Sequence, residues 1–421
     1  MADKFFRILL LFLPIVFLNI KHGVNAILFL LFFGAINFLA KQKTVNLFQK
    51  TILNERIPFS FVLLSPTLAI ALSQTIRVEF YPNNWDAPIR MVLCIPIYLA
   101  VSHGWLFRSG KNSITEDWIK WSIPIALCLT LITRAYFPAT NWTGYRTTYF
   151  VDPLSFCSYT LLFAFLTCLG VLHNSKEFNF LHKLFYLTSI FIGFYLSITS
   201  GARTGWLNLP VLIAILYLYS LTLKSNKEPI KFFLIIFFGL AVLISLNNQF
   251  MNKFYLGLQQ FINYKIYELN ADSSVSMRIS FYRMGVEYFF ERPFAGWGDI
   301  SWYKNTRQEF MVFASNEAIY APKHGFHNEI ITNSVRSGIW GFISVISLYI
   351  VVAYKAVSGL KMKLGEQHRL VSVSMLIVIL HLFFSGLVTE VTNLTFLSAF
   401  IGAFFAVLCG EQQFLKDNAS I

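Results

Sequence analysis

The feature that most constrains this chain is a succession of apolar runs, each about 17–22 residues long. A helix of that length crosses the roughly 30 Å hydrocarbon layer of a bilayer. Apolar residues make up 56% of the 421 residues and charged residues 13%, whereas about 25% of a soluble globular domain is charged. The sequence therefore predicts an all-α polytopic membrane protein.

We predict about twelve membrane-spanning helices from these runs. Residues 1–247 then form a transmembrane bundle of about nine helices, residues 248–327 one large loop, and residues 328–421 a bundle of about three. The first run resembles a secretory signal peptide, but the many spans behind it and the lack of a clear cleavage site favour a retained helix. The expected spans are about 5–20, 24–40, 57–76, 88–107, 118–137, 154–173, 181–199, 206–223, 230–247, 328–354, 370–389 and 392–410.

The formal net charge of +13 is explained first by membrane topology, because the inside loops of membrane proteins collect Lys and Arg. If the N-terminus lies inside, every connection expected on that side carries two or more cations. The C-terminus then also lies inside, and the large loop lies outside. The charge therefore indicates orientation among membrane lipids and does not call for a nucleic-acid partner.

The two sides also differ in the kind of cation, which is mostly lysine inside and mostly arginine outside. Lysine suffices for topology, whereas arginine makes bidentate contacts with phosphate or carboxylate. An outside arginine can also pack or pair with an outside acid, so the set carries more weight than any one member. The outside arginines are Arg77, Arg90, Arg134, Arg146, Arg203, Arg278, Arg283, Arg292, Arg307 and Arg336.

Two of these arginines lie against apolar spans. Arg134 comes near the outer end of its span, and Arg203 lies in the small-residue turn at residues 199–205. An ionisable group at membrane depth is costly and is by default a candidate for function, although an arginine at a span end can also snorkel to the interface. The glycines beside Arg203 permit close approach of a ligand to the backbone, which favours function there.

The large loop contains one expected amphipathic helix. Ser274 or Ser276 can cap it, and it runs to about Glu291 before Pro293 ends it. Such a helix could lie on the outer membrane surface or cap a cavity. The expected apolar stripe is Ile279, Tyr282, Val286, Phe289 and Phe290. The i, i+4, i+8 row of Arg283, Glu287 and Glu291 predicts ordinary ion pairs along the helix.

His327 lies where the loop re-enters the membrane. Histidine can accept a proton near neutral pH, which makes it a candidate base. His324 and Glu329 are close in sequence, but no HExxH or equivalent spacing is present, so we expect no metal site. Glu329 either orients His327 or caps the helix that follows.

The sequence contains no motif of the common nucleotide-binding, hydrolase or metal-dependent enzymes. The sequence lacks a Walker loop, GxGxxG, GxSxG and the paired acids that hold Mg²⁺ for nucleotide-sugar transfer. The five cysteines fall in or beside expected spans without metal-ligand or CxxC spacing. We therefore expect no cofactor.

Three segments, taken in order, form a pattern: Ser200-Gly201-Ala202-Arg203-Thr204; Ser276-Met277-Arg278 with Arg292-Pro293-Phe294-Ala295-Gly296-Trp297-Gly298; and His327-Asn328-Glu329-Ile330 with Gly338 and Gly341 behind it. The pattern resembles the O-antigen ligase family within the superfamily of O-antigen ligases and polymerases. The order of the segments, the number of spans and the single large loop late in the chain all fit. The residue-level likeness is confined to about residues 199–345.

This resemblance implies a metal-independent, inverting glycosyltransferase of the bacterial inner membrane, with its site at the periplasmic face. The donor would be an O-antigen chain on undecaprenyl diphosphate, and the acceptor would be the lipid A–core oligosaccharide. Carried over by motif, His327 would be the catalytic histidine, and Arg203 and Arg278 would bind the diphosphate. Candidate supporting residues are Arg134, Arg146, Arg283, Glu329 and Arg336.

Rival functions share the same donor. A polymerase of the superfamily joins lipid-linked repeat units to one another, and a protein O-oligosaccharyltransferase glycosylates protein. Acceptor pockets leave no local motif, so the sequence does not separate these from a ligase. A transporter for the same lipid would need polar residues through the membrane depth, whereas the cations here gather at one face.

Overall fold

The computed structural model is built from long apolar helices. It describes residues 2–41, 50–107, 113–137, 148, 150–174, 179–223, 228–245, 251–252, 255–256, 259, 262, 274–298, 325–362 and 364–419. Within these ranges the regular elements are all helical, which confirms the predicted fold class. The long helices are α1 (Ala2–Asn19), α2 (Gly23–Lys41), α3 (Lys50–Arg77), α4 (Asp86–Ser102), α6 (Ile123–Tyr136), α7 (Pro153–Asn174), α8 (Phe180–Thr199), α9 (Leu209–Leu221), α10 (Glu228–Ser245), α12 (Ser274–Glu291), α15 (Glu329–Met362), α16 (Glu366–Gly386) and α17 (Thr395–Ala419).

Each predicted span coincides with a helix. In the described part of the chain, 8 helical segments are long and apolar enough to cross a membrane. They comprise α2, α3, α4, α7, α8, α15, α16 and α17. Helices α1, α6, α9 and α10 occupy the other four predicted positions, and the total of twelve spans stays a prediction. Short elements complete the chain: α5 (Ile114–Asp117), a π-helix at Trp118–Ser122, and 3₁₀ helices at Pro82–Trp85 and Trp206–Asn208.

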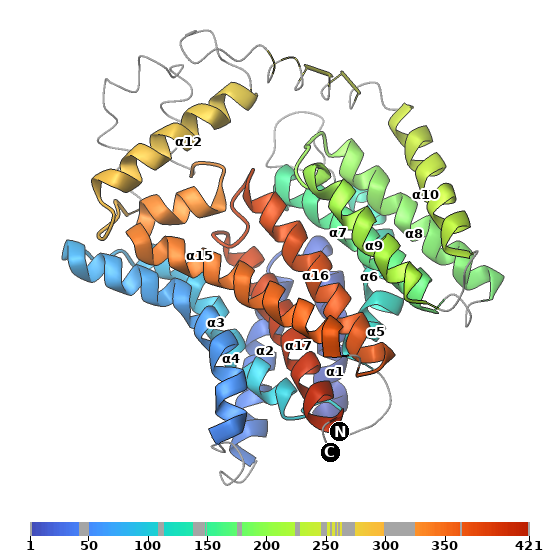
Figure 1. Cartoon of the computed structure of the whole chain (residues 1–421), viewed down its shortest axis with the longest axis horizontal. Coiled ribbons are helices and arrows are strands. Elements are labelled where there is room, and N and C mark those ends of the chain that lie inside the picture. Colours follow the sequence, from blue (N-terminus) through green and yellow to red (C-terminus); the bar gives the residue numbers. More distant parts are fainter. Residues whose placement is uncertain are drawn as a thin grey trace.

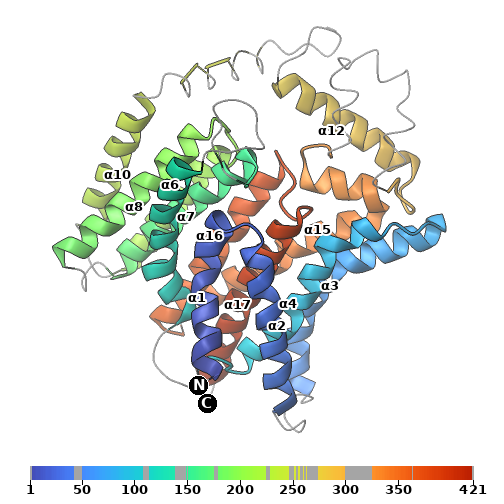
Figure 2. The same cartoon turned by 180° about the vertical axis from the view of Figure 1, so that it is seen from behind.

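The helices form a bundle with two distinct ends. Helix α1 begins and α17 ends at the bottom of Figure 1, whereas α12 lies across the top, and Figure 2 shows the same arrangement from behind. We call these the terminal end and the α12 end.

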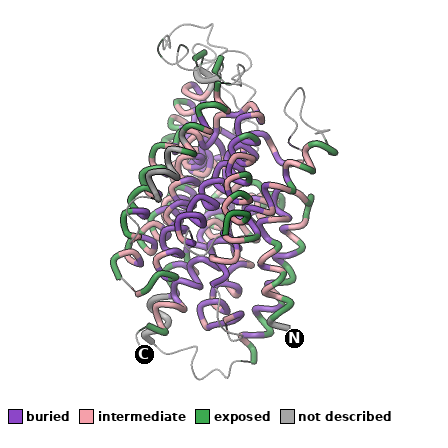
Figure 3. The backbone as a smooth tube through the Cα atoms, turned by 90° about the vertical axis from the view of Figure 1, so that its right-hand side faces the viewer, coloured by how far each residue is buried: buried purple, intermediate pink, exposed green. Residues whose placement is uncertain are grey.

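Helices α7 and α17 form the centre of the bundle. Their apolar windows are 94% and 89% buried, whereas those of α2, α3 and α8 are less than half buried. Buried residues accordingly fill the middle of the molecule in Figure 3. Stacked rings hold the centre, with Phe17 and Phe400 3.9 Å apart between centroids and Trp118 and Phe404 4.5 Å apart. The outer helices therefore present apolar side chains to lipid, as a multi-pass membrane protein requires.

A separate apolar cluster holds α12 on the first turns of α15. Phe281, Met284 and Tyr288 of α12 are buried there against Trp297 and Phe326. The helix bounds agree with the prediction. Val286 and Phe290 from the predicted stripe are 45% and 72% exposed, so the buried cluster uses an adjacent apolar face. The sequence alone does not show which of the two faces packs on protein.

The segment from Pro293 to Gly298 pairs with a break in α15. Ser337 and Gly338 leave helical geometry, with Gly338 at φ 61° and ψ −148°. The N–H groups of Trp297 and Gly298 donate to the carbonyls of residues 335 and 336 (2.8 and 3.0 Å), and the N–H of residue 339 donates to Pro293 (2.6 Å). The backbone groups released by the break are thus satisfied by this segment, which fixes the far end of α12.

Arg77, at the end of α3, fastens this pairing to the bundle. Its guanidinium donates to the carbonyls of Ala295 and Arg336 and pairs with Glu79 at 3.1 Å. The side chain is almost fully buried. Three elements distant in the sequence therefore meet at one arginine, which suits its planar set of donors.

Candidate active site

Arg203 lies in a tight turn between α8 and the 3₁₀ helix at Trp206–Asn208. Gly201 and Gly205 have φ of 70° and 88°, which glycine adopts without strain. The Arg203 side chain is half-buried, and burial lowers its pKa below the ordinary value. The turn thus holds a partly desolvated guanidinium at the α12 end.

A buried polar network fixes this turn from below. His381 on α16 is within 2.7 Å of both the Ser158 hydroxyl and the Asn208 side-chain amide. The amide nitrogen of Asn208 can only donate, so Nδ1 of His381 accepts and Nε2 carries the proton toward Ser158. A Cβ at Gly205 would lie 3.2 Å from the Cα of Ser158. Close packing and hydrogen bonds together therefore place Arg203.

Arg134 supports the same turn from α6. Its guanidinium donates to the hydroxyl of Thr199 and to the Thr199 carbonyl, the latter at 3.1 Å. A cation at a helix C-terminus meets the negative end of the helix dipole and satisfies a terminal carbonyl. The structure thus places Arg134 against the end of α8, four residues before Arg203.

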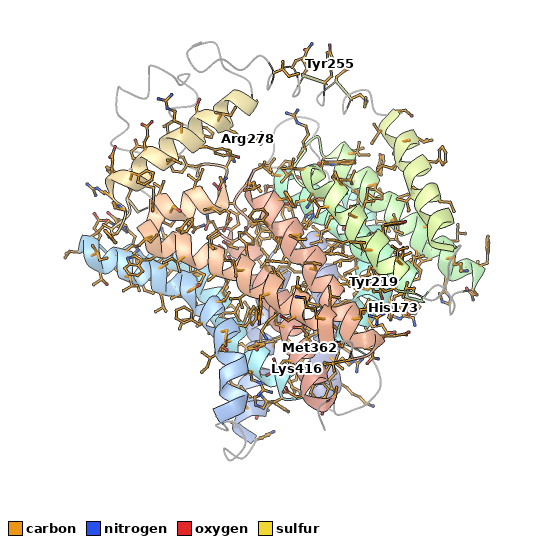
Figure 4. All side chains as sticks on the ribbon, in the orientation of Figure 1. His173, Tyr219, Tyr255, Arg278, Met362 and Lys416 are labelled. Atoms are coloured by element: carbon orange, nitrogen blue, oxygen red, sulfur yellow. The ribbon has the colours of Figure 1, made fainter. Side chains whose placement is uncertain are left out.

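Arg278 projects from the second turn of α12 and is marked at the α12 end in Figure 4. Burial is the main cause that lowers its pKa, and the nearby charge of Arg203 lowers it further. Tyr282 and Glu390 act in the opposite direction and favour the charged form. The structure therefore brings the two arginines predicted to bind diphosphate within electrostatic range of each other.

His327 lies just before α15 in a left-handed conformation, with φ of 51°. Its ring packs on Phe281 of α12, with the centroids 5.8 Å apart. The N–H of Phe326 donates to the Thr332 hydroxyl at 2.9 Å, and that hydroxyl donates to Glu390 at 2.7 Å. The turn that presents His327 is thus held by α12, α15 and the segment after α16.

The two acids near this turn have different roles. Glu329 is fully buried, and its carboxylate accepts from the N–H groups of residues 391 and 392. Glu390 accepts from the backbone N–H of His327, and burial raises the pKa of Glu390. Asn328 caps α15, since its side-chain oxygen accepts from the N–H of residue 331 at 3.0 Å. Glu390, and not Glu329, is thus the acid that contacts the His327 backbone.

The other predicted residues are placed as follows. Arg336 donates to the side chain of Asn393 at 2.9 Å, beside the same segment. Arg283 pairs with Glu287 at 3.3 Å, and both are exposed, as the helical spacing predicted. Arg146 lies outside the described residues, as does His324. Within the described ranges, no group of three or more His, Cys, Asp or Glu could hold a metal ion. The expectation that the reaction needs no metal stays a prediction.

Sequence reasoning missed four residues that shape the site: Arg77, Asn208, His381 and Glu390. Glu390 left a signal, because the polar interruption at residues 389–393 separates two spans on the same side as the loop. His381 left a weaker signal as a histidine within an apolar span. Arg77 appeared only as one of the outside arginines, and Asn208 left no signal, since the partners of both lie far away in the sequence.

Comparison with known proteins gives a consistent result. Residues 188–346 match the sequence model of a family described as O-antigen ligase. An uncharacterized protein of Haemophilus influenzae is 22% identical over 93% of this chain and 94% of its own length. The O-antigen ligase of Escherichia coli K12 is 26% identical over 47% of this chain and 46% of its own length. The matched range contains Arg203, Arg278 and His327, so the resemblance predicted from three short segments is confirmed: residues 188–346 are similar to the O-antigen ligase family.

Proposed function

We propose that this protein transfers an O-antigen saccharide from undecaprenyl diphosphate to the lipid A–core oligosaccharide. The reaction takes place at the periplasmic face of the bacterial inner membrane, with both termini in the cytoplasm. It inverts the anomeric centre and needs no metal ion. The observation that carries the proposal is the electrostatic interaction between Arg203 and Arg278, together with the packing of His327 on Phe281, which lies on α12 three residues after Arg278.

Two cations in a partly buried site repel each other, and burial adds to the cost of their charges. The lowered pKa of Arg278 reflects both effects. A bound diphosphate offsets the repulsion, since each guanidinium can make paired hydrogen bonds to its oxygens. The ligand class that best matches the site is therefore a dianionic or more highly charged phosphate.

The chemistry follows from these roles. An acceptor hydroxyl attacks the anomeric carbon from the side opposite the diphosphate, and the bond between that carbon and the diphosphate oxygen breaks. The hydroxyl proton passes to His327, and the negative charge that develops on the leaving oxygen is stabilised by Arg203 and Arg278. Removing one such charge-stabilising donor typically costs about 10²–10³ in rate.

A polymerase of the same superfamily, or a protein O-oligosaccharyltransferase, would use the same donor and the same three residues. Only the acceptor differs among these enzymes. A lipid transporter is a third possibility from another class. Arg203 lies in the turn after α8 and Arg278 near the start of α12, and such a placement at the ends of helices suits surface chemistry better than passage through the bundle.

The test is reconstitution without divalent metal. Purified protein is mixed with O-antigen on undecaprenyl diphosphate and with lipid A–core, and transfer is compared between wild type and His327→Ala. His22→Ala is the matched control, because His22 is an exposed histidine with a similar backbone conformation, φ 64°. We expect wild type and His22→Ala to make acceptor-dependent product and His327→Ala to make none above background.

Other outcomes select a rival. Elongation of the donor without lipid A–core would favour the polymerase, and transfer only to a protein acceptor would favour the oligosaccharyltransferase. Movement of donor across the bilayer with no transfer to any acceptor would remove the enzyme from consideration. Full transfer by His327→Ala would support the proposed reaction and show that His327 is not needed for it.

A further inference from the structure

The outward flank of α12 is a second apolar face of that helix. Successive residues of an α-helix turn by about 100°, which places Tyr282, Val286, Ile279 and Phe290 side by side and next to the packed face. Val286 and Phe290 are 45% and 72% exposed. Val286 and Phe290 of the predicted stripe thus point away from the bundle. Tyr282 lies at the edge of the stripe, where it packs on the buried cluster and its hydroxyl donates to the Leu387 carbonyl.

This flank continues beyond the helix. Phe294, three residues after the end of α12, is 64% exposed. It lines one open hollow together with Ile76 and Arg77 of α3. Val78 and Phe80, just after α3, are 91% and 70% exposed. The hollow is also lined by Glu79 and Glu291. Phe294 and Ile76 are therefore the apolar side chains through which the segment after α12 and the end of α3 meet.

The same surface joins the lipid-facing side of α3. Residues 56–77 form a candidate membrane span. The exposed apolar residues along it include Phe61 at 53%, Leu72 at 43% and Ile76 at 49%. In a spanning helix such side chains face hydrocarbon. Ile76 at the end of this row lines the same hollow as Phe294, so the exposed row on α3 meets the segment that continues α12.

We propose that the flank of α12 formed by Ile279, Val286 and Phe290, together with Phe294, lies in the interfacial layer of the bilayer. Helix α12 then lies along the membrane surface, and phospholipid covers its exposed apolar flank. This assignment does not depend on the reaction that the protein catalyses.

The remaining face of α12 agrees with this placement. Arg283 and Glu287 form an exposed ion pair, and Glu291 follows one turn later on the same row. A helix with one face on protein, one on lipid and a charged strip toward water is typical of an interfacial helix. The membrane then sets the depth of α12, and with it the depth of Arg278 near its other end.

Site-directed spin labelling tests the proposal. Single cysteines replace Phe290, Phe294 or Glu287 in a Cys128→Ala background, because the other four native cysteines are buried. Each variant is labelled with a nitroxide and placed in phosphatidylethanolamine–phosphatidylglycerol nanodiscs. Power saturation then compares collisions with oxygen, which concentrates in lipid, and with a water-soluble nickel complex. Phe61→Cys on α3 serves as the lipid-facing reference.

We expect the ratio of oxygen to nickel accessibility at positions 290 and 294 to resemble that at position 61 and to exceed that at position 287 severalfold. Nickel-dominated accessibility at 290 and 294, equal to that at 287, would overturn the proposal. Low accessibility to both reagents would overturn it too, since it would mean that protein covers the flank. Val286→Cys replaces either labelled phenylalanine position if that variant does not fold.

Discussion

At the terminal end of the bundle, arginine pairs with aspartate between helices that are far apart in the sequence. Arg56 on α3 donates to Asp417 on α17 at 2.8 Å and to the Ser102 hydroxyl at 2.9 Å. At the α12 end, by contrast, Arg203 and Arg278 lie near each other; burial lowers the pKa of Arg278, and the charge of Arg203 lowers it further. One end thus pairs opposite charges, whereas the other also brings like charges together.

The difference separates a structural use of arginine from a functional one. An ion pair between distant helices restricts how the helices pack, and removing one partner leaves a desolvated charge. Bringing two guanidiniums near each other raises the free energy of the folded protein. At Arg278, Tyr282 and Glu390 offset part of this cost, and a bound anion would offset more. The α12 end also contains structural arginines, since Arg77 fastens the segment after α12 to α15. The neighbours of an arginine, and not its position outside the membrane, indicate its role.

The largest expected effect comes from removing one arginine at each end and comparing the losses of transfer rate and of stability. Arg278→Ala should lower the transfer rate by about 10²–10³, as the loss of a charge-stabilising donor does, without lowering the apparent Tm. Arg56→Ala should lower the apparent Tm and leave the rate per folded protein unchanged, because its partners lie at the terminal end. Thermal unfolding and the reconstituted transfer assay at matched protein levels measure both.

Arg283→Ala is the matched control for Arg278→Ala, since both arginines lie on α12. The Arg283–Glu287 pair is exposed, and such pairs contribute about 0–1 kcal/mol. We therefore expect wild-type transfer and a nearly unchanged Tm from this variant. Equal losses of transfer from Arg278→Ala and Arg283→Ala would show that general charge, and not a built site, explains the effect.

The sequence predicts the parts of this site that depend on local pattern. Long apolar runs predict the helices, and the spacing of Arg283 and Glu287 predicts their ion pair. It does not predict which buried acid meets which backbone. Glu329 is adjacent to His327 in the chain yet binds the backbone of residues 391 and 392, whereas Glu390 contacts the His327 backbone from a separate segment. Such pairings depend on how α15 and α16 pack, which a pattern within one segment does not encode.

The face of α12 shows a second limit. The apolar stripe predicted from periodicity exists, but Phe281 and Tyr288 pack on the bundle instead. Hydrophobic periodicity finds an apolar face without saying whether protein or lipid covers it. In a membrane protein both are apolar surroundings, so the pattern that identifies a core face in a soluble protein is ambiguous here.

Replacing one glycine at each end of the bundle by alanine should change stability and transfer less than the arginine variants do. Gly338 and Gly365 both adopt conformations that only glycine occupies readily, with φ of 61° and 115°. A Cβ at Gly338 would lie 2.5 Å from the Pro293 carbonyl oxygen, whereas a Cβ at Gly365 meets nothing within 4 Å. Gly365→Ala should cost only backbone strain, about 1–3 kcal/mol, and retain transfer. Gly338→Ala should lower Tm further.

Transfer should separate the two variants more clearly than stability does. The clash at Gly338 loosens the pairing that fixes the end of α12. Arg278 then shifts from its position, and so does Phe281, whose ring contacts His327. Transfer per folded protein should fall for Gly338→Ala and stay at wild-type level for Gly365→Ala, with the soluble fraction after size exclusion used to count folded protein. If both variants keep full transfer, the break in α15 does not position the site.

The smallest expected effect is the pH dependence of stability that arises from Glu390, which contacts the His327 backbone at the α12 end. Burial holds the pKa of Glu390 above its ordinary value, so the folded protein binds this proton more tightly than the unfolded chain does. The stability from this group is therefore fully present below the unfolded pKa of about 4.3 and is lost as pH rises through the folded pKa.

Glu390→Gln cannot ionise and keeps an acceptor oxygen for the Thr332 hydroxyl. The Tm of this variant relative to wild type should rise between pH 4 and 8 and then level off. Asp417→Asn at the terminal end, where the acid is half-exposed and paired with Arg56, should give no such rise. A flat difference for Glu390→Gln across this range would mean that Glu390 stays ionised at no cost, and the α12 end would then resemble the terminal end in pairing its charges fully.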